Sequence, residues 1–406
     1  TTLPESATVN AAVCRQRIIV CMDGTWDAAS ARTNVFRFYN SLKTSYPLLQ
    51  STHQEQEQKE KCSLPYDKTV CWSQVAHYVK GVGTRNERIQ KYLGGAFGLG
   101  ISDQILTAYA FLSENYKGEQ DEIWLLGASR GGYAARSLTG MIYNVGLLPC
   151  EHITVALDKA YSLYRRADKK SHPNNPEAIA FRHRYDCWEP DIKFVGCFDT
   201  VGSLGVPRLP WFAGGSLLWN LFHGLHSFHD EKLSPNVKLA FHALSIHEQR
   251  EWFRPTIMKY ESIKRSDQIL EQLWFPGTHS DVIGGPKASR VLCNHSLRWM
   301  MIKAQECGLV FKLPIDEVCG ARAFLYNDSY KNQLVYRLLP RTDRYIDPIL
   351  FRNRNALYMN GHFSEYITNE QLRLFRSKAL DKFLSNIKEQ EKGNDNNGSS
   401  STSSRK

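Results

Sequence analysis

The stretch Glu122-Ile123-Trp124-Leu125-Leu126-Gly127-Ala128-Ser129-Arg130-Gly131-Gly132 carries the strongest structural signal in the sequence. Its apolar first half is typical of a buried strand, and the residues from Tyr133 to about Tyr143 predict a helix. Between them, Gly127-x-Ser129-x-Gly131 has the form of a nucleophile elbow, in which flanking glycines let a sharp strand-to-helix turn form without side-chain clash. An ordinary glycine-rich turn is the alternative, and the strand and helix on either side favour the elbow.

Four further apolar runs predict strands, and each is followed by a polar residue or loop. These runs are Arg17 to Met22, Ile192 to Phe198, Val237 to Ile246 and Leu273 to Phe275, with a helix predicted from Thr33 to Leu42. Strands that alternate with helical segments predict an α/β fold with a mostly parallel central sheet flanked by helices. Ligands of such sheets bind at the carboxyl ends of the strands, where Asp23, Ser129, Asp199 and His279 fall.

A serine elbow needs a base and an acid, which in this kind of fold follow the serine in the order acid, then histidine. Asp199 lies 70 residues after Ser129, and His279 lies 80 residues after Asp199. Taken alone, either residue could serve a turn or a helix cap, but their order and their placement at strand ends favour catalysis. Asp281 is the competing acid, although it would have to fold back on the short loop that carries the base.

Two backbone N–H groups are expected to bind the oxyanion. The first is that of Arg130, the residue after the nucleophile, at the N-terminus of the predicted helix. The second would come from the loop after the first strand, at Gly24 or Thr25. Asp23 could brace this loop through backbone N–H groups, or form an Asx-turn without a catalytic part.

Seven motifs extend the pattern along the chain. In order they are Asp23-Gly24-Thr25-Trp26, Gly81-Val82-Gly83-Thr84, Gly127-Ala128-Ser129-Arg130-Gly131, Phe198-Asp199-Thr200-Val201-Gly202-Ser203, Phe228-His229-Asp230, His242-Ala243-Leu244 and His279-Ser280-Asp281-Val282-x-Gly284-Gly285. Together they resemble the uncharacterised α/β-hydrolase domain family of fungi and bacteria, over roughly residues 15 to 300. Its bacterial members include the type VI secretion phospholipase effectors.

This resemblance implies an α/β-hydrolase-like fold with insertions and a Ser129–Asp199–His279 triad. It further implies an esterase or lipase that cleaves carboxylic esters, with phospholipid as the substrate of the bacterial branch, and no metal or organic cofactor. Three residues depart from the family pattern: Ala128 replaces an aromatic residue, Ile283 interrupts a glycine run, and His247 replaces an acid. The first two could alter the shape of the substrate pocket.

Composition narrows the function classes. The 406 residues include 51 Lys and Arg against 41 Asp and Glu, a net charge of +10. The basic residues are scattered and no nucleic-acid-binding signature occurs, so we expect no nucleic-acid partner, while contact with an anionic membrane surface stays open. No run of 18 apolar residues predicts a membrane-spanning helix. The sequence does not indicate an oligomeric state.

The ten cysteines form no CxxC pair, which favours a reducing compartment, and several lie inside apolar runs. No apolar signal-peptide core precedes Arg17, so a cytoplasmic location is expected. Because the sequence does not begin with Met, a removed leader stays open.

We expect one large hydrolase domain over residues 17–387, preceded by a flexible segment, 1–16, and followed by a disordered tail, 388–406. A Gln/Glu-rich stretch at about 50–61 predicts a mobile insertion. The aromatic-rich stretch 206–228 could be a lid over an acyl pocket or part of the core. The region after about 300 could hold sheet-covering helices or a small subdomain.

Three other functions were weighed. His223, His226 and His229 are spaced as if to bind a metal, but no carboxylate or cysteine pattern completes the site. Asp23-Gly24-Thr25 is similar to the motif of aspartate-based phosphatases, which need a nucleophilic Asp where this chain has Cys21. The remaining alternative is an inactive hydrolase fold that serves as a binding or scaffold protein, because a fold does not fix a function.

Overall fold

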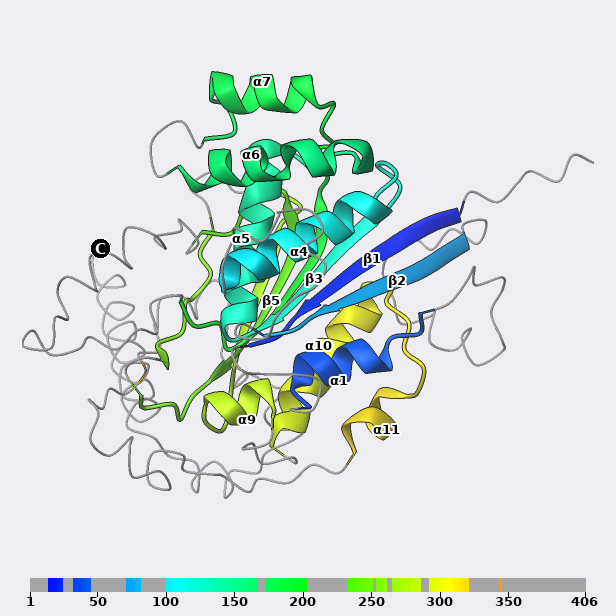
Figure 1. Cartoon of the computed structure of the whole chain (residues 1–406). Coiled ribbons are helices and arrows are strands. Elements are labelled where there is room, and N and C mark those ends of the chain that lie inside the picture. The colour runs from blue at the N-terminus through cyan, green and yellow to red at the C-terminus, as the bar shows by residue number, and fades with distance from the viewer. Residues whose placement is uncertain are drawn as a thin grey trace, which may run out of the picture.

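The computed structural model describes residues 14–24, 32–44, 71–81, 100–166, 172–202, 232–250, 253–260, 265–285, 292–320 and 344. Its centre is a six-stranded sheet in the order β2-β1-β3-β4-β5-β6, and every neighbouring pair is parallel (Figure 1). The strands are β1 (Cys14–Met22), β2 (Cys71–Val79), β3 (Glu122–Ala128), β4 (Ile192–Phe198), β5 (Val237–Ser245) and β6 (Ile269–Phe275). The predicted α/β-hydrolase-like architecture is confirmed.

Helices cover both faces of this sheet (Figure 1). One face carries α4 (Ile101–Asn115) and α5 (Arg130–Val145), with η2 (Cys150–His152), α6 (Ile153–Arg165) and α7 (Pro176–Arg184) outside them. The other carries α1 (Asn34–Ser41), α9 (His279–Ile283), α10 (Cys293–Glu306) and α11 (Ile315–Cys319). Parallel strands need such cover, because both of their faces are apolar.

Alternation along each strand divides the core into two clusters. Ile18, Val20 and Met22 of β1 belong to the cluster beneath α4 and α5, whereas Ile19 and Cys21 belong to the opposite one. In that second cluster, aromatic rings stack across three neighbouring strands, from Trp124 to Phe194 to Phe241, with ring centroids 5.0 Å apart at both steps. The central strands are therefore fixed from both faces.

The sequence prediction missed one strand, β2, at the edge of the sheet. Its polar residues hide the apolar pattern: Gln74, for example, is buried and donates to the carbonyls of Lys43 and Val310. β1 also begins at Cys14, before the apolar run that starts at Arg17. The other four predicted strands form, and Thr33 caps α1 by accepting a hydrogen bond from Phe36 N.

Several predicted features lie outside the described residues: the insertion at 50–61, the lid or core segment at 206–228, the tail at 388–406, and most of the region after 320. They stay predictions.

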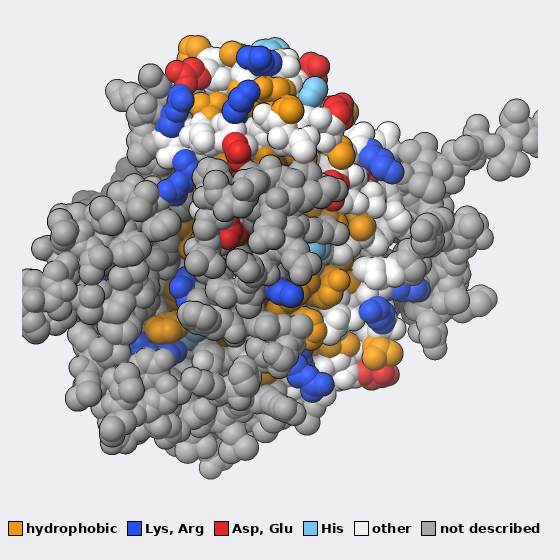
Figure 2. Space-filling model, in the orientation of Figure 1, with side chains coloured by type: hydrophobic (Ala, Val, Ile, Leu, Met, Phe, Trp, Pro, Cys, Tyr) orange, Lys and Arg blue, Asp and Glu red, His pale blue; other side chains and the backbone are white. Residues whose placement is uncertain are grey.

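On the face in Figure 2, basic and acidic side chains are interspersed over α6 and α7. Among the described residues, no helix combines the length and the apolarity that crossing a membrane requires.

The strand order places the candidate site. The chain runs from β1 to β2 on one side and returns to β3 on the other, so the loops after β1 and β3 diverge at a topological switch point. All six strands are parallel, so the loops after β3, β4, β5 and β6 meet at the same sheet edge (Figure 1).

At Gly131 the start of α5 lies close against the end of β1. A Cβ atom there would lie 2.3 Å from Met22 O and 2.5 Å from Asp23 O. We expect Gly131→Ala to destabilise the fold by about 3 kcal/mol, the upper end for overpacking, because both obstacles are backbone atoms. Thermal or urea unfolding measures this loss.

Gly140→Ala is the matched control on the same helix. Its Cβ would meet only the Tyr164 side chain, at 3.4 Å or more. This variant should be as stable as the wild type or more stable, because alanine is the better helix former. Equal stability of the two variants would contradict the close approach at Gly131.

Candidate active site

Ser129 occupies a strained turn between β3 and α5. It has φ 53° and ψ −120°, a backbone conformation that L-residues rarely adopt. A hydrogen bond from Ser129 N to Phe198 O, 2.9 Å long, ties the turn to the end of β4. A Cβ on Gly127 would lie 2.4 Å from Gly131 O, so the turn closes only with glycine there. The predicted elbow geometry is present.

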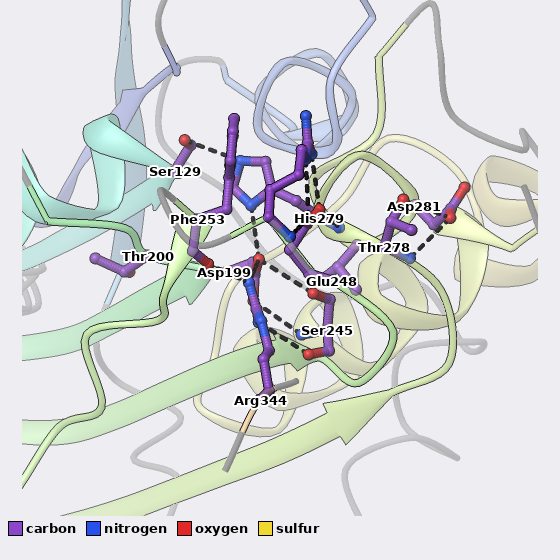
Figure 3. A network of polar contacts seen from close by, with 12 residues as sticks. Ser129, Asp199, Thr200, Ser245, Glu248, Phe253, Thr278, His279, Asp281 and Arg344 are labelled. Atoms are coloured by element: carbon purple, nitrogen blue, oxygen red, sulfur yellow. Dashed lines mark hydrogen bonds and ion pairs between the residues drawn. The ribbon is translucent and has the colours of Figure 1, made fainter. Parts of the chain in front are cut away.

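His279 lies between Ser129 and Asp199 (Figure 3). Its Nε2 is 3.0 Å from Ser129 Oγ, and its Nδ1 is 2.6 Å from Asp199 Oδ2. It is the first residue of α9, directly after β6 and the turn at Gly277, and all three side chains are buried. The three residues predicted from order and strand ends therefore form one hydrogen-bonded chain.

Of the three residues Ser129, His279 and Asp199, Asp199 accepts the most hydrogen bonds. It has φ 41°, and its carboxylate accepts from Ser245 N at 2.8 Å and Ser245 Oγ at 3.3 Å, at the end of β5. The guanidinium of Arg344 lies against it, with Nη1 2.5 Å from Oδ1 and Nη2 2.8 Å from Oδ2. Burial alone would raise the pKa of Asp199, but the Arg344 charge and the hydrogen bonds from His279 and Arg344 outweigh it, so this pKa lies well below its usual value.

The competing acid, Asp281, has a different partner. Its Oδ2 accepts from Thr278 N and from Thr278 Oγ1, both at 2.9 Å, in a capping box at the start of α9. It thus holds the helix that carries His279, whereas Asp199 contacts the imidazole itself (Figure 3).

A second buried ion pair supports His279 from its backbone side. Glu248 Oε2 accepts from His279 N at 3.1 Å, and Arg250 binds the same carboxylate through Nε at 2.8 Å and Nη2 at 2.7 Å. The Arg250 guanidinium lies 3.7 Å from the ring centre of Phe253, which packs 4.8 Å from the imidazole. Burial opposes ionisation of Glu248, yet Arg250 keeps the pKa of this carboxyl below its ordinary value. Sequence reasoning missed this group.

Asp23 braces the loop after β1 through one backbone N–H and two hydroxyl groups, whereas the sequence suggested several backbone N–H groups. Its Oδ1 accepts from Gly24 N at 2.8 Å, and its Oδ2 accepts from Thr33 Oγ1 at 2.6 Å and from Tyr78 OH at 2.5 Å. The Gly24 N–H, a candidate oxyanion donor, is thus bound to Asp23 in this structure. Thr25, the alternative donor, lies outside the described residues.

Arg130 N, the other candidate donor, belongs to the first residue of α5. N–H groups in the first turn of a helix have no partner four residues back within the helix, and they lie at the positive end of its dipole. Arg130 N thus lies directly after Ser129 at the start of α5, and its role as an oxyanion donor stays a prediction.

His242 lies beneath the site and is uncharged at neutral pH. Its Nε2 accepts from Thr200 N at 3.0 Å, and Nδ1 lies 3.3 Å from Gln272 Oε1. Burial, and then the nearby charge of Arg136, lowers the pKa of His242 to about 3. The ring therefore fixes the backbone next to Asp199 without adding charge.

The three departures from the family pattern can be placed. Ala128 and Ile283 are buried in the core cluster beneath α1 and α10. His247 lies beside Glu248, and its Nδ1 accepts from Gly277 N at 2.8 Å, at the turn before His279. Across the described ranges no three His, Cys, Asp or Glu side chains are grouped to hold a metal, and His223, His226 and His229 lie outside those ranges.

Comparisons with known proteins agree with the motifs. The family model described as "T6SS, Phospholipase effector Tle1-like, catalytic domain" matches residues 16–303. Uncharacterized protein YEL023C of Saccharomyces cerevisiae (strain ATCC 204508 / S288c) is 27% identical over 214 residues, which are 48% of this chain and 28% of that protein.

Two solved structures are also similar. An uncharacterized protein from Pseudomonas aeruginosa has 16% identity and a TM-score of 0.39, over 76% of this chain and 49% of that chain. The Tle1 effector bound to the VgrG spike from the Type 6 secretion system has 19% identity and a TM-score of 0.26, over 67% of this chain and 51% of that chain. This chain thus spans about half the length of each solved structure and less of the yeast protein.

The surroundings of Asp23 predict a pH effect on stability. Burial raises the pKa of its carboxyl from 3.8 to about 6, even though Thr33, Tyr78 and Gly24 donate to it. An unfolded carboxyl releases its proton earlier, so Asp23 makes folding less favourable as pH rises from about 4 through 6. Over this interval the effect is on the order of 3 kcal/mol.

Asp23→Asn should remove this dependence. The difference in melting temperature, variant minus wild type, should be larger at pH 7.5 than at pH 4.5. Only the wild type must ionise a buried acid as the pH rises. Thermal unfolding of both proteins at the two pH values measures the effect. A constant difference between them would show that Asp23 titrates as an ordinary carboxyl.

Proposed function

We propose, because the chain belongs to the family of Tle1-like phospholipase effector catalytic domains of type VI secretion, that it is a serine hydrolase of lipid carboxylic esters. The observation that carries this proposal is the buried hydrogen-bonded chain from Ser129 through His279 to Asp199. Its residue types, order and geometry are those of a catalytic triad.

The geometry supports the following reaction. An ionised carboxylate can only accept hydrogen bonds, so His279 carries its proton on Nδ1 and Nε2 accepts from the Ser129 hydroxyl. Ser129 Oγ attacks the ester carbonyl carbon while its proton passes to Nε2. The tetrahedral intermediate collapses, the C–O bond to the alcohol breaks, and His279 returns the proton to the departing alcohol.

The second half regenerates the enzyme. Water attacks the acyl-enzyme carbonyl and gives a proton to Nε2, and the bond to Ser129 Oγ breaks as His279 returns that proton to the serine. Asp199 stabilises the imidazolium that forms in each half. Its lowered pKa keeps it ionised throughout the range in which a histidine titrates.

We assign the oxyanion to two backbone donors. Arg130 N–H supplies one, at the N-terminus of α5. The loop after β1 supplies the other, from Gly24 or Thr25. If Gly24 is the donor, its N–H must turn from Asp23 Oδ1 to the oxyanion as the substrate binds.

The family supports a lipid ester as the substrate, with phospholipid as the first candidate. Contact with an anionic membrane surface is part of this proposal, because the chain carries a net charge of +10. An inactive hydrolase fold used as a scaffold is the alternative. The strained backbone at Ser129 favours the enzyme, since strain of this kind persists chiefly at functional sites.

A fluorophosphonate probe and p-nitrophenyl esters test the triad. Ser129→Ala should lose all labelling, and Ser129→Ala and His279→Ala should each reduce kcat/KM by about four orders of magnitude or more. The double variant should be no worse than either single variant, because triad members act as a unit. Independent, multiplicative losses would argue against a triad.

Asp199→Asn and Asp281→Asn form a matched pair that tests the acid. Asp199→Asn should lose about 10⁴-fold, as replacement of the triad aspartate does in serine proteases. Asp281→Asn weakens only the cap of α9, so it should lower the melting temperature and leave most of the activity. The reverse ranking would identify Asp281 as the acid.

The pH profile gives an independent test. His279 must be neutral to accept the serine proton, and Asp199 stays ionised because its pKa lies well below the usual range. With chemistry shown to be rate-limiting, log kcat/KM should therefore rise with pH, with a slope of one proton, as His279 loses its proton. A flat profile from pH 5 to 9 would exclude His279 as the base.

A further inference from the structure

With the residues that the structure describes, Arg344 makes four polar contacts, and all four lie inside the candidate site. Besides the two bonds to Asp199, Nη1 donates to Ser245 O at 2.8 Å and Nη2 donates to Phe253 O at 2.6 Å. The residue is 6% exposed, and Asp199 is fully buried. Figure 3 shows the guanidinium on the side of Asp199 away from His279.

These contacts join three parts of the site. Asp199 supplies the carboxylate, Ser245 ends β5, and Phe253 packs its ring 4.8 Å from the imidazole. A planar guanidinium can bind both carboxylate oxygens at once, so it fixes the rotation of the carboxylate as well as its position. Oδ2 is thereby held where it accepts the 2.6 Å bond from His279 Nδ1.

The family match ends at residue 303, and Arg344 follows that end by 41 residues (344 − 303). No sequence motif marked it, because a lone arginine has no characteristic pattern. Arg344 therefore reaches the site from beyond the matched residues, whereas α11, which also follows them, packs in the core cluster on one face of the sheet.

We infer that Arg344 is a positioning residue of the active site, which acts through Asp199 and sets the lower pH limit of activity. This inference rests on the proposed hydrolase function. Among the described residues Arg344 bonds to Asp199, Ser245 and Phe253, so it acts on the reacting atoms only through them. Arg344 holds the Asp199 carboxylate in position, and Asp199 in turn orients the His279 ring.

The charges around the pair explain the effect on pH. Asp199 faces two groups that can be cationic, Arg344 and His279. The Glu248–Arg250 ion pair has no net charge, and the charge of Arg344 also helps to lower the pKa of Glu248. His242 interacts electrostatically with Arg136, Asp199 and Arg344. It stays neutral because burial, and then Arg136, lower its pKa.

Arg344 is thus a permanent positive charge beside Asp199. When His279 is protonated, its positive charge interacts with a carboxylate that Arg344 already binds. Without Arg344, the protonated imidazole would be the only cation among the described residues in contact with that carboxylate. The Asp199–His279 pair would then take up a proton at higher pH, and the base would be lost sooner as pH falls.

Three variants separate charge, geometry and general stability. Arg344→Gln removes the charge, so kcat/KM should fall about 100-fold, as for a misplaced catalytic group, and the acid limb of its pH profile should move up by about one pH unit. Arg344→Lys keeps the charge without the bidentate fork, so its acid limb should stay near that of the wild type while kcat remains about 10-fold low.

Arg182→Gln is the matched control. Arg182 is also largely buried and donates to two backbone carbonyls, those of Asn144 and Pro173, but it touches none of the site residues. Its variant should lose melting temperature and keep the wild-type pH profile. The inference would be overturned if Arg344→Gln lowered only the melting temperature and left the acid limb and kcat unchanged. Arg344 would then have a purely structural role.

NMR titration of the His279 ring, in protein labelled at histidine, reads the same coupling without a substrate. The midpoint should move to higher pH in Arg344→Gln and return toward the wild type in Arg344→Lys. If the wild type cleaves no ester and takes no fluorophosphonate label, the proposed function fails while this titration still tests Arg344. An unchanged midpoint in Arg344→Gln would refute the coupling whatever the activity.

Discussion

The site depends on one buried negative charge. Asp199 is fully excluded from solvent, and an isolated carboxylate in such a place would take up a proton. It stays ionised because Arg344, His279 and Ser245 all direct donors at it. These donors come from β5, α9 and a residue far along the chain, so the carboxylate also links the elements that form the site.

Two of the four described non-glycine residues with positive φ belong to the site. Ser129 and Asp199 both have positive φ, and they end neighbouring strands, β3 and β4. The bond from Ser129 N to Phe198 O holds the two turns together. Such conformations persist only when the surroundings fix them, and here a parallel sheet with apolar packing on both faces supplies that rigidity.

The sequence predicted what is local and periodic. The apolar runs located five of the six strands, and strand ends brought Ser129, Asp199 and His279 to one edge of the sheet. β2 was missed because its polar residues, such as Gln74, are satisfied by distant backbone carbonyls. Arg344 was missed for a related reason: its role comes from contacts 145 and 99 residues away, which no local pattern encodes.

Two buried aspartates, Asp23 after β1 and Asp199 after β4, show why charge, rather than burial, decides their ionisation. Asp23 and Asp199 are equally inaccessible, and each accepts several hydrogen bonds. Among the described residues Asp23 has only neutral donors, and burial raises its pKa to about 6, whereas the guanidinium beside Asp199 outweighs burial and lowers that pKa. At Asp23 the neutral donors therefore only reduce the rise in pKa that burial causes, whereas the cation beside Asp199 lowers the pKa below its usual value. The acid that must stabilise an imidazolium is the one with that cation.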